Sequence, residues 1–97
     1  MVYINLRLNV ADFDKWLTAF LGFESYRKDA GSTGVNQIYH DVDDPNNVTL
    51  IMEWADADKA RAFLNNPQTK ANMDAAGVTG RPTVLAVQTK AQGIPGD

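Results

Sequence analysis

Apolar and polar side chains alternate along residues 2–10. A period of two is typical of a β-strand that buries one face and leaves the other more polar. The pattern therefore predicts a strand whose buried face points into the core. The apolar positions are Val2, Ile4, Leu6, Leu8 and Val10.

A helix is predicted after this strand, because Asp12 can accept a hydrogen bond from a free N–H of the first turn. Gly22 either ends the helix or is tolerated inside it, and the polar run 24–28 can continue it. Residues 29–34 are predicted to form a loop from their composition. The apolar stripe of the helix, at spacings of three and four, is Phe13, Trp16, Leu17, Phe20 and Leu21.

A hairpin is predicted from two strands, 35–42 and 48–54, and a turn over 43–47 that is rich in Asp, Asn and Pro. If the turn pairs Val42 with Val48, the register follows, and a slip of one residue would exchange the faces of a strand. On one face His40 then lies opposite Leu50, Ile38 opposite Met52 and Asn36 opposite Trp54. On the other face Asp41 lies opposite Thr49, Tyr39 opposite Ile51 and Gln37 opposite Glu53.

The second helical region is predicted to be split. Asp56 or Asp58 can cap its first part, and Asn66–Pro67 is a typical helix start. A strand follows over 81–90, and Pro82 suits an edge strand. The order β-α-β-β-α-β predicts an α+β class protein, a ferredoxin-like sandwich with a four-stranded antiparallel sheet.

This organisation makes residues 1–90 a single ferredoxin-like domain and residues 91–97 a C-terminal tail. The helices should cover one face of the sheet. The open face is predicted to carry Tyr3, Tyr39 and Ile51, and a partner subunit is the simplest cover for them. We therefore expect a homodimer.

Composition and charge argue against several classes of function and kinds of site. The 97 residues carry a net charge of −3 with scattered Lys and Arg, which argues against nucleic-acid binding. Cysteine is absent, which excludes disulfides, thiolate metal sites and cysteine nucleophiles. No apolar run reaches the length of a membrane span. The N-terminus runs directly into a strand without a signal peptide, so the expected location is cytoplasmic.

The acidic stretch after His40 resembles a calcium loop only at its start. A calcium loop needs oxygen ligands at alternate positions, a glycine and a closing glutamate. The sequence has Pro45, Asn46 and Met52 at those three places. We therefore interpret the stretch as a turn, and predict no metal site and no cofactor.

Three side chains are candidates for a small-molecule site. His40, on the apolar face of its strand, is the candidate catalytic residue as a general base or acid; the alternative is a hydrogen-bonded histidine at the sheet edge. Trp16 and Trp54 are candidate ligand-binding residues with His40, because they could stack on an aromatic molecule. The alternative for both is core packing.

The opposite face of the sheet is the predicted dimer interface. Arg7 and Glu53 could form a charge pair there, which is tolerated on burial only with hydrogen bonds on every side. The alternative is a polar ligand site between the two sheets. The predicted interface residues are Asn5, Arg7, Tyr39, Ile51 and Glu53.

Several motifs resemble the dimeric α+β barrel superfamily, close to its antibiotic-biosynthesis-monooxygenase-like group. They are Asp12–Trp16 with Phe20, Asp43–Asn46 before Val48, Glu53–Trp54, Lys59–Phe63 and Ala76–Val78. The resemblance implies this fold and dimerisation into an α+β barrel. The resemblance does not imply haem binding. The haem-degrading members carry a ligand histidine on the second helix, and the corresponding residues 56–77 contain no histidine here.

The resemblance leaves three functions open. The first is a dimeric protein that binds a small apolar or aromatic molecule between sheet and helices. The second is a cofactor-independent monooxygenase or cyclase that acts on an aromatic polyketide-like substrate. The third is a stress-type dimeric scaffold without a ligand. The first two predict a cavity between sheet and helices, and the third predicts a filled interior.

Overall fold

The computed structural model describes residues 1–94. Within them the elements are β1 (Val2–Val10), α1 (Phe13–Gly22), α2 (Glu24–Ala30), β2 (Ser32–His40), β3 (Asn47–Trp54), α3 (Ala57–Asn65), α4 (Pro67–Ala75) and β4 (Val78–Gln88). None of these helices is long and apolar enough to cross a membrane. Residues 89–94 carry no helix or strand, and the last part of the predicted tail, 95–97, lies outside the described residues.

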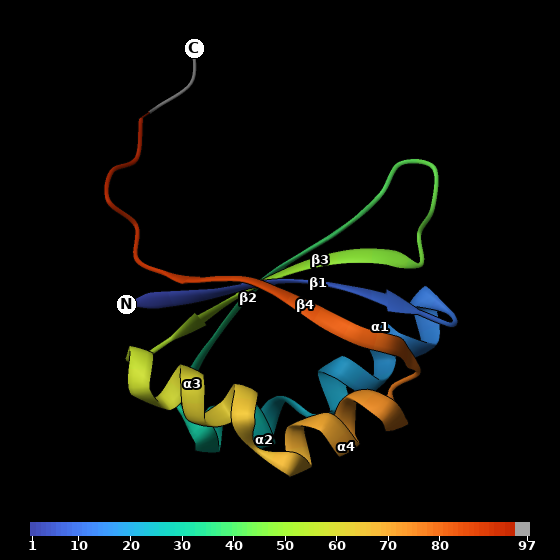
Figure 1. Ribbon diagram of the computed structural model, residues 1–97, viewed down its shortest axis with the longest axis horizontal. Helices are drawn as coiled ribbons and strands as arrows, with labels where there is room; N and C mark the ends of the chain where they lie inside the picture. The colour runs from blue at the N-terminus through green and yellow to red at the C-terminus, as the bar shows by residue number, and fades with distance from the viewer. Residues whose placement is uncertain (95–97) are drawn as a thin grey trace.

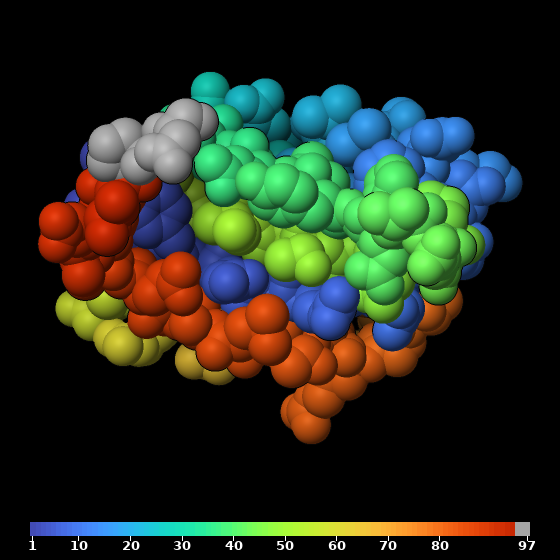
Figure 2. Space-filling view, turned by 90° about the horizontal axis from the view of Figure 1, so that it is seen from above, coloured from blue at the N-terminus to red at the C-terminus, as the bar shows by residue number. Residues whose placement is uncertain are grey.

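The strands form one antiparallel sheet in the order β2-β3-β1-β4. The helices cover one face of it, and the other face is open (Figures 1 and 2). This arrangement confirms the predicted ferredoxin-like α+β fold with a split second helix.

Alternation along the two central strands builds the core. β1 and β3 turn every second side chain toward the helices, where most are buried away from water. Helices α1 and α3 cover them with two buried residues each. The buried core set is Ile4, Leu6, Leu8, Val10, Trp16, Phe20, Val48, Leu50, Met52, Trp54, Ala60, Phe63, Ala76 and Val78.

Three of the helices begin at capping residues that the sequence predicted. Asp12 and Asp56 accept first-turn backbone N–H groups at 3.0 and 2.8 Å. Asn66 does the same for α4, at 2.9 Å, with Pro67 as its first residue. Of the two candidate caps for α3, the structure selects Asp56.

The predicted loop over 29–34 is wrong. Helix α2 runs to Ala30 and β2 begins at Ser32, so Gly31 alone makes the reversal. Its φ of +123° lies in a region that glycine adopts readily and other residues avoid. One glycine therefore replaces a whole loop.

The hairpin turn is confirmed, but its predicted register is wrong by two residues. His40 pairs with Val48 and is the last residue of β2. Asn46 fixes the longer loop, because its side-chain oxygen accepts a hydrogen bond from Phe13 N at 3.0 Å and its carbonyl accepts one from Val10 N at 2.9 Å. A shift of two residues preserves the faces, so His40 stays on the helix side of the sheet.

The fourth strand begins three residues before the predicted Arg81. It is an edge strand, as Pro82 indicated, and its pairing with β1 is irregular between Thr79 and Thr83. Gly80, at φ +70°, lies in this irregular segment. A proline is tolerated there because an edge strand and a bulge require fewer backbone donors.

Candidate ligand cavity between sheet and helices

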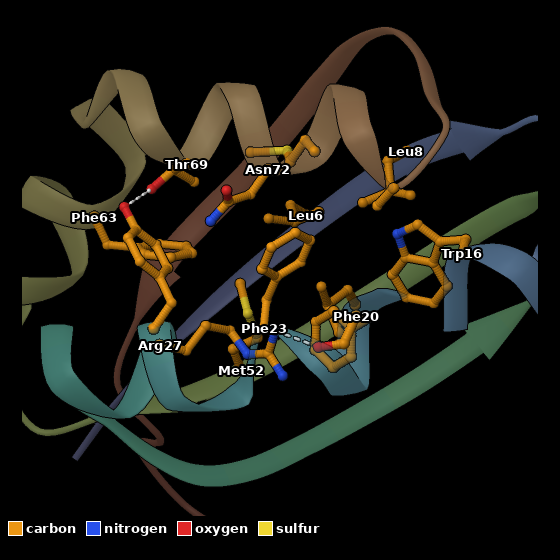
Figure 3. Close-up of a pocket in the computed structure, with 14 residues that line it drawn as sticks. Leu6, Leu8, Trp16, Phe20, Phe23, Arg27, Met52, Phe63, Thr69 and Asn72 are labelled. Atoms are coloured by element: carbon orange, nitrogen blue, oxygen red, sulfur yellow. Dashed lines mark hydrogen bonds between the residues drawn. The ribbon is translucent and has the colours of Figure 1, made fainter. Parts of the chain in front are cut away.

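A cavity of about 60 Å³ lies between the sheet and the helices. Its walls come from β1, β3 and all four helices, and most of the side chains are apolar (Figure 3). The lining residues are Leu6, Leu8, Trp16, Phe20, Phe23, Tyr26, Arg27, Leu50, Met52, Phe63, Thr69, Asn72, Met73 and Ala76. A small apolar chamber with few polar groups is typical of a ligand site.

The cavity is smaller than an aromatic ligand needs. An apolar cavity of about 150 Å³ holds benzene, and drug-sized ligands occupy about 300 Å³ or more. Binding therefore requires a wall to move. Helix α4 is a candidate for the mobile wall, since its one fully buried side chain is the small Thr69, whereas α2 buries the long Arg27 and α1 and α3 bury two side chains each.

Polar groups gather on the wall formed by α2 and α4. The hydroxyls of Tyr26 and Thr69 are 3.0 Å apart and share a hydrogen bond that joins the two helices. The side-chain oxygen of Asn72 accepts a hydrogen bond from Gln68 at 2.8 Å, and its nitrogen points toward the cavity (Figure 3). These are the groups that can orient a polar atom of a ligand.

Arg27 is the one charged side chain that is buried among the described residues, with 4% of its surface exposed. Its Nη1 donates to the carbonyl oxygen of Phe20 at 2.7 Å, and its guanidinium carbon lies 3.7 Å from the centre of the Phe20 ring. Its Nε is buried without a hydrogen-bond partner. Burial lowers the pKa of Arg27, and the charge of Glu24 partly opposes this.

The two tryptophans lie in different surroundings. Trp16 lines the cavity and packs on Phe20, with ring centres 5.1 Å apart. Trp54 is fully buried against Phe63, at 4.6 Å, and is not part of the lining. Its Nε1 has no hydrogen-bond partner.

His40 does not line this cavity. It is exposed, and lines an open surface depression with Phe13, Pro45 and Asn46. Its Nδ1 lies 2.9 Å from the carbonyl oxygen of Asp41, and its ring meets Phe13 edge-on at 4.9 Å. The structure therefore does not bring His40 together with Trp16 and Trp54 in one pocket.

The predicted interface residues do share the open face of the sheet. β1 and β3 place Asn5 opposite Ile51, and β2 adds Tyr39, which is 55% exposed. The expected Arg7–Glu53 pair is replaced by an exposed pair of Arg7 with Asp41, at 3.2 Å.

Glu53 instead lies opposite Tyr3 across the two central strands. The pKa of the Tyr3 phenol is raised, first by burial and then by the negative charge of this carboxylate. Among residues 1–94, no group of three or more His, Cys, Asp or Glu side chains is placed to hold a metal ion.

The polar lining residues were not predicted from the sequence: Tyr26, Arg27, Thr69 and Asn72. One signal was available for Arg27. The stripe of α1 continues at the same spacing through Phe20 and Phe23 to Arg27, although a kink at Phe23 divides the helix. A charged residue on an apolar stripe is a candidate for a buried functional group.

Solved structures share this architecture over nearly their whole length. SnoaB, a cofactor-independent oxygenase from Streptomyces nogalater, is 20% identical, with 98% of this chain and 97% of that chain covered and a TM-score of 0.70. An antibiotic biosynthesis monooxygenase is 15% identical, with coverages of 96% and 100% and a TM-score of 0.64. The chain has the fold of the antibiotic-biosynthesis-monooxygenase-like α+β superfamily. This confirms the resemblance at the level of the fold.

One further structure with this fold has no known function. A protein of unknown function from Nitrosomonas europaea is 18% identical, with coverages of 99% and 95% and a TM-score of 0.64. No family model matches the chain, and no curated protein matches it. Because one fold hosts many activities, function has to be inferred from the side chains that line the cavity.

Proposed function

We propose that this protein binds a small apolar or aromatic molecule in the cavity between the sheet and the helices. The observation that carries the proposal is the chamber itself, apolar on most sides and polar only where α2 faces α4. Such a chamber gains affinity from apolar burial and orientation from a few polar groups.

Entry of the ligand involves an outward movement of α4. The helix buries Thr69 alone and contributes Asn72 and Met73 to the cavity wall. Its apolar contact with the core comes from the partly buried Met73 and from Ala76 at its end. Met73 and Met52 add adaptable surface, because the unbranched methionine side chain repacks easily.

Binding of 2-naphthol, a small neutral aromatic probe, tests this function. A ligand that binds only the folded state raises the melting temperature in a saturable way. Ala76→Leu places an isopropyl group in the cavity and should weaken binding at least about tenfold, since overpacked sites tolerate little added volume. Ala75→Leu, on the exposed side of the same helix end, is the matched control and should bind as the wild type does.

Two outcomes would contradict the proposal. One is no saturable shift with 2-naphthol or related two-ring compounds, which would favour the non-catalytic scaffold. The other is unchanged binding in a folded Ala76→Leu protein, which would place the ligand elsewhere.

A second candidate function is a cofactor-independent monooxygenase or cyclase that acts on an aromatic polyketide-like substrate. The shared fold with SnoaB, itself a cofactor-independent oxygenase, favours it. The chemistry requires a base that deprotonates a phenol, so that the resulting carbanion can react with oxygen. Tyr26 and Thr69 are the hydroxyl groups on the cavity wall, whereas His40 is the candidate base from the sequence.

Oxygen uptake with a polycyclic phenol measures this activity. His40→Ala should leave the melting temperature nearly unchanged, because His40 is exposed. Loss of turnover in this variant would support His40 as the base. Retained turnover would remove it from the mechanism and direct attention to Tyr26.

The homodimer belongs to the same proposal, with the open faces of two sheets packed into a barrel in the cytoplasm. Tyr39 and Ile51 provide apolar surface on this face, and the side-chain oxygen of Asn5 is buried there without a partner. Ile51→Lys should shift the sedimenting species from dimer to monomer. Ala62→Lys, on the exposed side of α3, should not. A wild-type protein that sediments as a monomer would contradict the dimer.

A further inference from the structure

Arg27 poses an energetic problem that its structural contacts do not solve. Moving a charge out of water is costly unless the charge is paired and fully hydrogen-bonded. Among residues 1–94 the ion pairs are formed by Arg7, Lys28 and Lys70, and none by Arg27. Glu24, the acid that influences Arg27, pairs with Lys28 at 3.4 Å.

Two structural contacts use only part of the guanidinium. Nη1 donates to the carbonyl oxygen of Phe20 near the end of α1, which also accepts a hydrogen bond from Phe23 N at 3.2 Å. The flat face of the group lies over the Phe20 ring. Both leave the edge that carries Nε without a hydrogen bond.

The free edge of a guanidinium matches a carboxylate in shape and charge. Arginine presents parallel N–H donors in a rigid plane, and this arrangement binds a carboxylate with two hydrogen bonds. A neutral side chain could serve the Phe20 carbonyl without the cost of a buried charge. The charge itself therefore calls for an anion that is absent from the protein's own residues.

We infer that the ligand is an aromatic carboxylic acid, with its ring in the cavity and its carboxylate on Arg27. This inference rests on the proposed ligand-binding function. Figure 3 shows the Arg27 guanidinium beside Phe20 in the lower middle of the view and Trp16 at the far right, so the charged group and this apolar part of the lining lie apart. A ligand with one acidic end and one apolar end matches that polarity.

The lining contains no competing negative charge. Its other polar members are neutral: Tyr26, Thr69 and Asn72. The Asn72 nitrogen that points toward the cavity is a second donor for a carboxylate or for a polar substituent on the ring.

Paired probes that differ only in charge test the inference. Isothermal titration calorimetry compares 2-naphthoate with 2-naphthamide, which keeps the ring and removes the negative charge. The wild type should bind the acid at least about tenfold more tightly, since hydrogen bonds to charged groups are the strong ones. Arg27→Met should abolish this preference and leave binding of the amide within about threefold.

Two further variants separate pairing from simple charge attraction. Arg27→Lys should keep part of the preference, because it retains the charge and loses the planar pair of donors. Lys28→Met removes an exposed neighbouring charge and should keep the full wild-type preference. A lost preference in Lys28→Met would overturn the inference in favour of a surface site.

The affinities of the wild-type protein for the acid and the amide test the inference even if Arg27→Met does not fold. Equal affinity for acid and amide, both weakened by Ala76→Leu, would overturn the carboxylate assignment and leave the cavity as a ligand site. Failure of both probes and of 2-naphthol to bind would instead reject the proposed function. A preference for the acid that Arg27→Lys removes entirely would still support pairing at Arg27.

Discussion

The hydrogen bond between Tyr26 and Thr69 is predicted to be the main polar tie between α4 and the rest of the protein. Thr69 is 2% exposed and is the buried residue of α4, and its hydroxyl lies 3.0 Å from that of Tyr26. Thr69→Val keeps the branched shape and replaces this hydroxyl with a methyl group. The variant therefore removes the hydrogen bond with little change in packing.

The magnitude follows from the surroundings of Tyr26. A typical hydrogen bond contributes about 1 kcal/mol net, and a buried group left unpaired costs about 1–3 kcal/mol. Tyr26 is half-buried, so water can reach its hydroxyl after a small movement, and the lower end of that range applies. We expect a loss of about 1 kcal/mol, or about 4–8 °C in melting temperature for a domain of this size.

Urea unfolding followed by tryptophan fluorescence measures this loss, in a double-mutant cycle with Tyr26→Phe. The two substitutions should be non-additive by roughly 0.5–1.5 kcal/mol, because either one removes the same bond. Thr18→Val is the control: its hydroxyl bonds within α1 on the exposed surface, and the change should stay within about 0.5 kcal/mol. Additive effects of Thr69→Val and Tyr26→Phe would refute the tie.

Three other substitutions test the fold. Asp56→Ala should destabilise the protein by about 1 kcal/mol, because it removes the side-chain cap of α3. Asp58→Ala, at a first-turn residue that does not form this hydrogen bond, should cost clearly less. Equal losses of stability in urea unfolding would contradict the assignment of Asp56 as the cap. Gly77→Ala should cost about 1–2 kcal/mol because φ is +87° there, with no atom near the added carbon, while Gly22→Ala at the end of α1 should be neutral or stabilising. The pKa of Tyr3 is raised in the folded protein, so the unfolded phenol ionises first and stability should fall as pH rises above about 10. Tyr3→Phe should flatten the plot of urea midpoint against pH in this range. An unchanged slope in the variant would contradict the contribution of Tyr3.

The fold was predictable because its signals are local. The period of two in residues 2–10, the caps Asp12 and Asp56, and the Asn66–Pro67 start each act within a few positions. The hairpin register was not predictable from local signals, because a long-range hydrogen bond sets it. The side chain of Asn46 accepts this bond from the backbone N–H of Phe13, 33 positions away in the chain.

The site was only partly predictable for the same reason. Trp16 could be placed on the inner stripe of its helix, and it does line the cavity. Arg27 lies within a polar run whose composition indicates an exposed helix, and only the packing of α2 against the sheet buries it. The pairing of Tyr26 with Thr69 links positions 43 residues apart, which no local pattern encodes.

Three energetic compromises coincide on one wall of the protein. The charge of Arg27 is buried without an anion, space of about 60 Å³ is left unfilled, and α4 has Thr69 as its one fully buried side chain. A scaffold selected only for stability gains nothing from any of these, since a neutral side chain, a filled core and a better-anchored helix would each stabilise it. Natural proteins break local rules of this kind mainly at functional sites. One ligand would resolve all three, because its ring fills the space, its carboxylate pairs with Arg27, and its contacts hold α4 in place. The coincidence therefore favours a binding protein over a ligand-free scaffold.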